Sequence, residues 1–197
     1  MILHNVLADL DKILSEVTPL IDLYKNKEFS FYKRSLKWFE KLEKFSDDNQ
    51  WIIKAEIASL RGKVITASRV QPDDTFDWMP KSKNRRRAKE ALTAECINLA
   101  VSLTMTFVQQ DRELQAEASN ILRQIIASGV SKGLIDSRPR LTIDSQFVQQ
   151  SWSVVASDPE LAPMCTHVIG LIGAYNAYML FDKAFGDIFF NGQDDSW

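Results

Sequence analysis

The sequence predicts an all-α protein, a single-domain bundle of about six helices around a long buried central helix. The segment from Ala91 to Phe107 is apolar around most of a helical circumference, and a helix that is apolar on two sides is buried on two sides. The 197 residues include only seven Gly and six Pro. Apolar and polar residues never alternate, as they would in a strand, for more than about four residues.

Composition bounds the class of protein. With 45% hydrophobic residues, a real core is expected, and we predict one domain over residues 1–190 with a frayed tail at 191–197. Cys96 and Cys165 lie in apolar stretches, which favours free buried thiols in a reducing compartment over a disulfide. No basic leader opens the chain. We therefore expect a cytoplasmic protein.

Charge is unevenly spread along the chain. The formal net charge is −2, yet residues 1–100 hold 18 basic and 15 acidic side chains, whereas residues 101–197 hold 6 and 11. This asymmetry predicts one basic and one acidic surface.

The first predicted helix spans residues 2–25 and carries a heptad-like stripe of Leu3, Leu7, Leu10, Leu14, Val17, Ile21 and Tyr24. Three heptads fit either the core of a bundle, which the width of the stripe favours, or a partner interface through the first four leucines. Pro19 should kink the helix near Val17 or Thr18.

The second predicted helix, residues 29–45, is aromatic and basic. Lys33, Lys37 and Lys41 share one face. They form either an ordinary solvated face or a stripe that follows nucleic-acid phosphates. The third helix, residues 50–68, should return antiparallel to the second across a short turn.

A long irregular loop is expected over residues 70–84, followed directly by the basic start of the central helix. Three arginines at a helix N-terminus oppose the macrodipole unless an anion neutralises them. Together with an aromatic side chain for stacking, they form a candidate nucleic-acid site, whose members are Trp78, Lys81, Lys83, Arg85, Arg86 and Arg87. The alternative is simple charge balance with Asp73, Asp74 and Asp77.

The central helix is expected over residues 88–126, continuing through the polar Gln109–Asp111. One predicted buried stripe contains Leu92, Cys96, Leu99, Leu103 and Phe107, and a second contains Ile97, Val101, Met105 and Val108. Gly129 and Gly133 are expected stop signals. Glu95, midway along this helix, is either a buried acid with a shifted pKa or the rim of a polar strip, and the rim is favoured.

The C-terminal part predicts two helices. The first covers residues 143–156, and the second begins at Asp158–Pro159–Glu160 and ends near Phe190. Small residues of the second helix should pack against the central helix: Thr166, Gly170, Gly173, Ala177 and Ala184. Residues 164–181 carry no formal charge, but His167 and Asn176 favour a core helix over a membrane span.

No motif assigns a reaction. The chain lacks a glycine-rich phosphate loop, a nucleophile elbow and paired Cys-x-x-Cys motifs, and its two histidines exclude a His-rich metal site. We therefore predict no cofactor and no metal. The leading hypothesis is a non-enzymatic interaction subunit that binds a protein partner or itself. The alternatives are a nucleic-acid-contacting subunit and an enzyme with a carboxylate site near Glu95.

Overall fold

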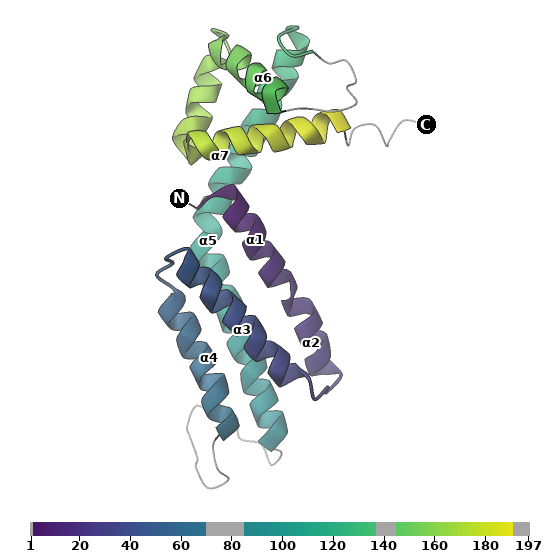
Figure 1. The fold of residues 1–197 in the computed structure, drawn as a ribbon, viewed down its shortest axis with the longest axis vertical. Helices are drawn as coiled ribbons and strands as arrows, with labels where there is room; N and C mark the ends of the chain where they lie inside the picture. Colours follow the sequence, from purple (N-terminus) through teal and green to yellow (C-terminus); the bar gives the residue numbers. More distant parts are fainter. Residues whose placement is uncertain (1, 70–84, 137–144, 191–197) are drawn as a thin grey trace, which may run out of the picture. The chain divides into compact units, whose positions relative to one another are not determined.

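The structure is a computed structural model that describes residues 2–69, 85–136 and 145–190. This part of the chain is all-helical, as predicted. Its helices, shown in Figure 1, are α1 (His4–Ser15), α2 (Val17–Lys25), α3 (Phe31–Asp48), α4 (Lys54–Arg69), α5 (Arg85–Ser131), α6 (Ser145–Ser157) and α7 (Ala162–Phe190). The predicted loop at 70–84 and tail at 191–197 lie outside the described residues.

The chain divides into two compact packing units. Unit 2 contains residues 6–109, and unit 1 contains residues 1–5 and 110–197. Helix α5 contributes its first part to unit 2 and its remainder to unit 1. The expectation of one domain over residues 1–190 stays a prediction.

Unit 2 packs α1, α2, α3, α4 and the start of α5 around a core of large apolar side chains. Trp38, Phe39 and Leu42 of α3 are fully buried. The Trp38 indole Nε1 donates a hydrogen bond to the Ile13 carbonyl oxygen at 2.9 Å, which satisfies the polar end of a buried ring. Helix α4 runs back antiparallel to α3 across a short turn, as predicted (Figure 1).

Pro19 breaks the first predicted helix slightly earlier than expected. The break falls at Glu16, between α1 and α2. Proline has no N–H, and its ring clashes with the carbonyl four residues earlier, which here belongs to Ser15. The single helix expected over residues 2–25 is therefore two helices.

Helix α5 is continuous over 47 residues, which confirms the predicted continuity through Gln109–Asp111 and extends the helix at both ends. In unit 2 one stripe is buried: Thr93, Cys96, Ile97, Ala100, Thr104 and Val108. The prediction of burial on two sides is wrong for Leu99 and Met105, which are 50% and 38% exposed. The threonines tolerate burial because their hydroxyls donate to carbonyl oxygens one turn earlier, at 2.8 Å for Thr93 and 2.7 Å for Thr104.

Unit 1 is built around an aromatic cluster. Phe181 and Phe185 of α7 are fully buried against Leu122 and Ile125 of α5 and Val155 of α6. The ring of Trp152 packs edge-on against Phe181 with centroids 5.0 Å apart. On α6, Val148 and Val155 are both buried in this core.

Helix α5 ends in a Schellman motif at Gly133, which was one of the two predicted stop signals. Gly133 has φ +70°, its N–H bonds the Val130 carbonyl oxygen at 3.0 Å, and the Leu134 N–H bonds that of Gly129 at 2.8 Å. Gly129 itself is buried within the helix, and an added Cβ would lie 2.8 Å from Ile135 Cδ1. The prediction of a stop at Gly129 was therefore wrong: close packing explains that glycine.

Helix α7 turns sharply at Gly173, which has φ +78° and ψ +156° (Figure 1). The prediction of one small-residue seam along this helix is wrong, because residues on either side of the turn do not share a face. Ala177 and Ala184 are buried, whereas Thr166 is exposed and Gly170 has open space at its Cβ position.

Two helices in the described residues are long and apolar enough to cross a membrane by length and composition alone: α5, and α7 as far as Phe189. Core helices of soluble proteins meet the same criterion.

Candidate functional site

The structure brings two of the predicted basic clusters together at one end of unit 2, where α2 ends and α3 and α5 begin. Arg86 Nη2 donates to the Lys27 carbonyl oxygen at 2.7 Å, and Lys89 Nζ lies 3.7 Å from the centre of the Tyr32 ring. We call this region the basic end; its cations are Lys25, Lys27, Lys33, Arg34, Arg85, Arg86, Arg87 and Lys89.

Some of these cations make contacts with other residues of the fold. Arg86 Nε bonds Glu90 Oε1 at 2.6 Å, and its guanidinium lies 3.8 Å from the centre of the Phe29 ring. Burial, with the nearby charge of Arg85, lowers the pKa of Lys89. Arg86 is therefore a structural residue that fixes the start of α5 against the α2–α3 turn, and not a side chain free to follow phosphates.

Other cations of the candidate nucleic-acid site remain available. Lys33, Lys37 and Arg85 are exposed and form no ion pair with another described residue. Lys41, by contrast, pairs with Glu16 at 2.7 Å. Arg87 lines a cavity of about 420 Å³. Trp78, Lys81 and Lys83 lie outside the described residues.

An exposed ring stands beside these cations. Phe29 is 87% exposed on the α2–α3 turn, and sequence reasoning did not select it. Its neighbours include Lys27 and the stacked Arg86 guanidinium. A ring flanked by cations is the type of platform on which single-stranded bases stack.

The leucines predicted as a partner interface do not form an open seam. Leu7 and Leu10 are 5% and 0% exposed in the core of unit 2, so a partner cannot reach them in this conformation. Leu14 is half-buried, and Leu3 is 43% exposed. The heptad-like stripe therefore serves intramolecular packing over most of its length.

A different helix surface is left uncovered. Within unit 2, α5 presents a strip with no charged side chain between Cys96 and Gln110. We call it the uncharged face; its exposed members are Asn98, Leu99, Ser102, Met105, Thr106 and Gln109. The predicted polar strip supplies four of these residues, and the two apolar ones were expected to be buried.

The carboxylate-site hypothesis requires an enclosed acid at Glu95. Glu95 is exposed at the end of the uncharged face, as the rim interpretation expected, so the burial that an active-site acid here required is missing. Burial raises the pKa of the Cys96 and Cys165 thiols, which keeps both protonated and poor as nucleophiles. In the described part of the chain, no group of three or more Cys, His, Asp or Glu side chains is arranged to hold a metal ion.

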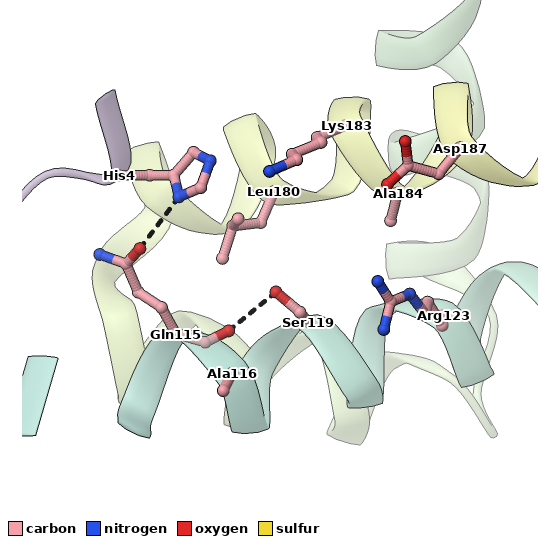
Figure 2. Close-up of a pocket in the computed structure, with 9 residues that line it drawn as sticks. All are labelled: His4, Gln115, Ala116, Ser119, Arg123, Leu180, Lys183, Ala184 and Asp187. Atoms are coloured by element: carbon pink, nitrogen blue, oxygen red, sulfur yellow. Dashed lines mark hydrogen bonds between the residues drawn. The ribbon is translucent and has the colours of Figure 1, made fainter. Parts of the chain in front are cut away.

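Unit 1 contains a polar cleft between α5 and the second half of α7 (Figure 2). Its volume is about 200 Å³. The polar side chains around it are those of His4, Gln115, Ser119, Arg123, Lys183 and Asp187. None of these residues was selected from the sequence as a binding residue.

Buried amides hold the N-terminal segment at one end of this cleft. The His4 N–H donates to Asn176 Oδ1 at 3.0 Å, and Gln115 Nε2 donates to the Ile2 carbonyl oxygen at 3.0 Å. Gln115 and Asn176 are 6% and 2% exposed. The contacts join residues 113 and 172 positions apart, and no local pattern signals such pairs.

The same network fixes the tautomer of His4. Its Nδ1 lies 3.0 Å from Gln115 Oε1 (Figure 2). Because Gln115 Nε2 donates to a carbonyl, its Oε1 is the acceptor, so Nδ1 carries a proton, and in the neutral imidazole Nε2 then has the lone pair. His167, the other histidine, is exposed, with Nε2 3.9 Å from Glu117 Oε1.

These surfaces have no counterpart from which to read a function. No protein-family model, no curated protein and no solved structure matches the chain.

Proposed function

We propose that the protein is a non-enzymatic helical interaction subunit that pairs with a second copy of itself through the uncharged face of α5. The observation that supports this proposal is the exposure of Leu99 and Met105 on a helix surface that carries no charged side chain over three turns. Charged residues normally solvate the exposed surface of a helix, and exposed apolar side chains within an uncharged surface favour contact with another protein.

A second copy fits this face because the face is compatible with itself. A two-fold dimer places the same patch of both subunits in contact, and a patch without charges meets its copy without like-charge repulsion. In an antiparallel pair centred on Ser102, Leu99 of one copy and Met105 of the other lie at the same level. The small Ser102 side chain lets the helices approach closely.

The size of the face sets the strength of pairing. From Asn98 to Gln109 the helix covers about 18 Å, which buries less area than a standard protein interface. We therefore expect a reversible dimer with a dissociation constant in roughly the micromolar range.

Sedimentation over a concentration series tests this pairing. The parent protein should shift from monomer to dimer as its concentration rises. Ser102→Arg, which puts two like charges at the crossing point, should keep it monomeric. Ser59→Arg is the matched control, because Ser59 is exposed on α4, and it should dimerise normally. A protein that is monomeric throughout, or a dimer insensitive to Ser102→Arg, would refute the proposal.

The convergence of the basic end favours one second candidate, a nucleic-acid-contacting subunit. The triple variant Lys33→Gln/Lys37→Gln/Arg85→Gln leaves the structural Arg86 intact. It should weaken binding of a short single strand and reduce the slope of log affinity against log salt by about 2, from roughly 0.7 per lost phosphate contact.

A matched control separates local contacts from net charge. Lys12→Gln/Lys44→Gln/Lys63→Gln removes the same charge from exposed positions outside the candidate nucleic-acid site, and it should change affinity little. Absence of binding at low salt, or equal losses in the two triple variants, would eliminate this candidate.

A further inference from the structure

The cleft of unit 1 has a surplus of positive charge. Arg123 of α5 and Lys183 of α7 line it from opposite sides, and Figure 2 shows the Arg123 head group pointing from α5 toward α7. Neither forms an ion pair with another described residue; Arg123 Nη1 has only Asn120 Oδ1 at 3.5 Å. Asp187 supplies a carboxylate at the same cleft, so the described residues that line it carry one positive charge in excess.

The polar side chains of this cleft come from three segments of the chain. Each segment is held in place by its own contacts. His4 is fixed by hydrogen bonds to both Gln115 and Asn176. Lys183 follows the buried Phe181 on α7, and Arg123 follows the buried Leu122 on α5. The charged head groups are therefore carried by backbone positions that the aromatic core of unit 1 holds in place.

We propose that this cleft binds a small molecule that carries a phosphate group. Arginine presents paired N–H donors in a fork that matches two oxygens of a phosphate, and lysine adds a mobile point charge. His4 Nε2 can accept a hydrogen bond from a hydroxyl of the ligand. A cleft of about 200 Å³ holds the volume of about seven waters, enough for a phosphate on a short organic chain. This inference is independent of the pairing surface of unit 2.

Calorimetric titration with inorganic phosphate at low ionic strength tests the site, with succinate as the contrast. Phosphate should bind, and succinate, which offers planar carboxylates, should bind more weakly. Lys183→Gln and Arg123→Gln should each reduce phosphate affinity about tenfold, the effect of losing a charge-assisted hydrogen bond. Lys183→Arg should retain binding, and Lys63→Gln, at an exposed lysine of α4 outside the basic end, should match the parent.

Amide chemical shifts locate the ligand. Phosphate should move the signals of residues 115–123 and 180–187 in the parent and not in Lys183→Gln. Folding of each variant is checked by its thermal transition, and a variant that melts early is replaced by Arg123→Lys, which should weaken binding while retaining the charge. Shifts confined to unit 2, equal losses in Lys63→Gln and Lys183→Gln, or succinate binding as tightly as phosphate would overturn the proposal.

Discussion

Units 1 and 2 of this protein are stabilised in different ways. Unit 2 is one continuous stretch of chain whose helices share an apolar core and are joined at the surface by ion pairs, such as Arg61 with Glu40 and Glu43. Unit 1 joins the first five residues of the chain to residues 110–197, and buried Gln115 and Asn176 hold that junction. The difference teaches that a contiguous bundle depends on helical periodicity, whereas a discontinuous one needs specific polar contacts.

The largest expected effect tests whether the two units unfold separately. Phe39→Ala in unit 2 and Phe181→Ala in unit 1 each remove a fully buried ring and should cost about 3–5 kcal/mol. Hydrogen exchange should show that Phe181→Ala weakens protection in α6 and α7 while α3 and α4 keep theirs, with the reverse for Phe39→Ala. Uniform loss of protection in either variant would show a single cooperative domain over the chain.

Removal of a buried amide should show how far unit 1 depends on its polar junction. Asn176→Ala leaves the His4 N–H without its acceptor, and an unsatisfied buried donor costs about 1–3 kcal/mol. Urea unfolding should report this loss, and the amides of residues 2–5 should exchange faster. Asn120→Ala, at an exposed position on α5 of the same unit, is the control and should remain within about 0.5 kcal/mol of the parent. Equal stability of the two variants would contradict a contribution of the Asn176 hydrogen bond to the stability of unit 1.

Two glycines should respond with opposite signs. Gly133 in unit 1 has φ +70°, so Gly133→Ala should destabilise by about 1 kcal/mol or more. Gly62 in unit 2 lies inside α4 with nothing within 4 Å of an added Cβ, so Gly62→Ala should stabilise by up to about 1 kcal/mol. Thermal unfolding of both variants checks the prediction, and changes of the same sign would contradict it.

The smallest expected effect concerns an ion-pair cluster of unit 1. Lys132 Nζ lies 2.9 Å from Asp158 Oδ1 and 2.6 Å from Glu160 Oε2. Asp158 Oδ1 also accepts the Glu160 and Leu161 N–H groups at 3.0 and 3.1 Å. The hydrogen bond from Lys132 and these backbone bonds lower the pKa of Asp158, and the carboxylates of Glu160 and Asp158 raise the pKa of Lys132.

The signs of these shifts give the pH window. Because the Asp158 pKa is lower in the folded state, its stabilisation is present above the unfolded pKa of about 3.9 and is lost as the pH falls through the folded value. Because the Lys132 pKa is raised, its stabilisation is present below the unfolded pKa of about 10.4 and is lost as the pH rises through the folded value. Asp158→Asn should therefore lower the melting temperature at pH 7, and the difference from the parent should shrink in strong acid. A difference that stays constant with pH would contradict this account.

Several elements could be predicted from local sequence because their causes are local. The helical class, the continuity of α5, the antiparallel α3–α4 pair and the stop at Gly133 all follow from periodicity, turn residues and backbone freedom. The position of the Pro19 break was predicted to within two residues, since the steric clash acts on the preceding turn.

Other features could not be predicted from the sequence. A helical wheel shows which residues share a face, but it does not show which face packs against a neighbouring helix. Leu99 and Met105 fit the core pattern, yet the neighbouring helices cover a different stripe of α5. The small-residue strip of α7 was in phase along the sequence, but Gly173 breaks that phase by adopting a conformation that only glycine takes easily.

The sequence by itself determined an all-helical chain with a long central helix and a basic start to that helix, because helical spacing and charge are properties of short segments. Only the tertiary structure decided that Arg86 is held within the fold while Lys33 and Arg85 stay available. It also decided that His4 reaches the buried Gln115 and Asn176 to close a cleft. Those contacts join residues more than a hundred positions apart, and their energy depends on burial that no local pattern records.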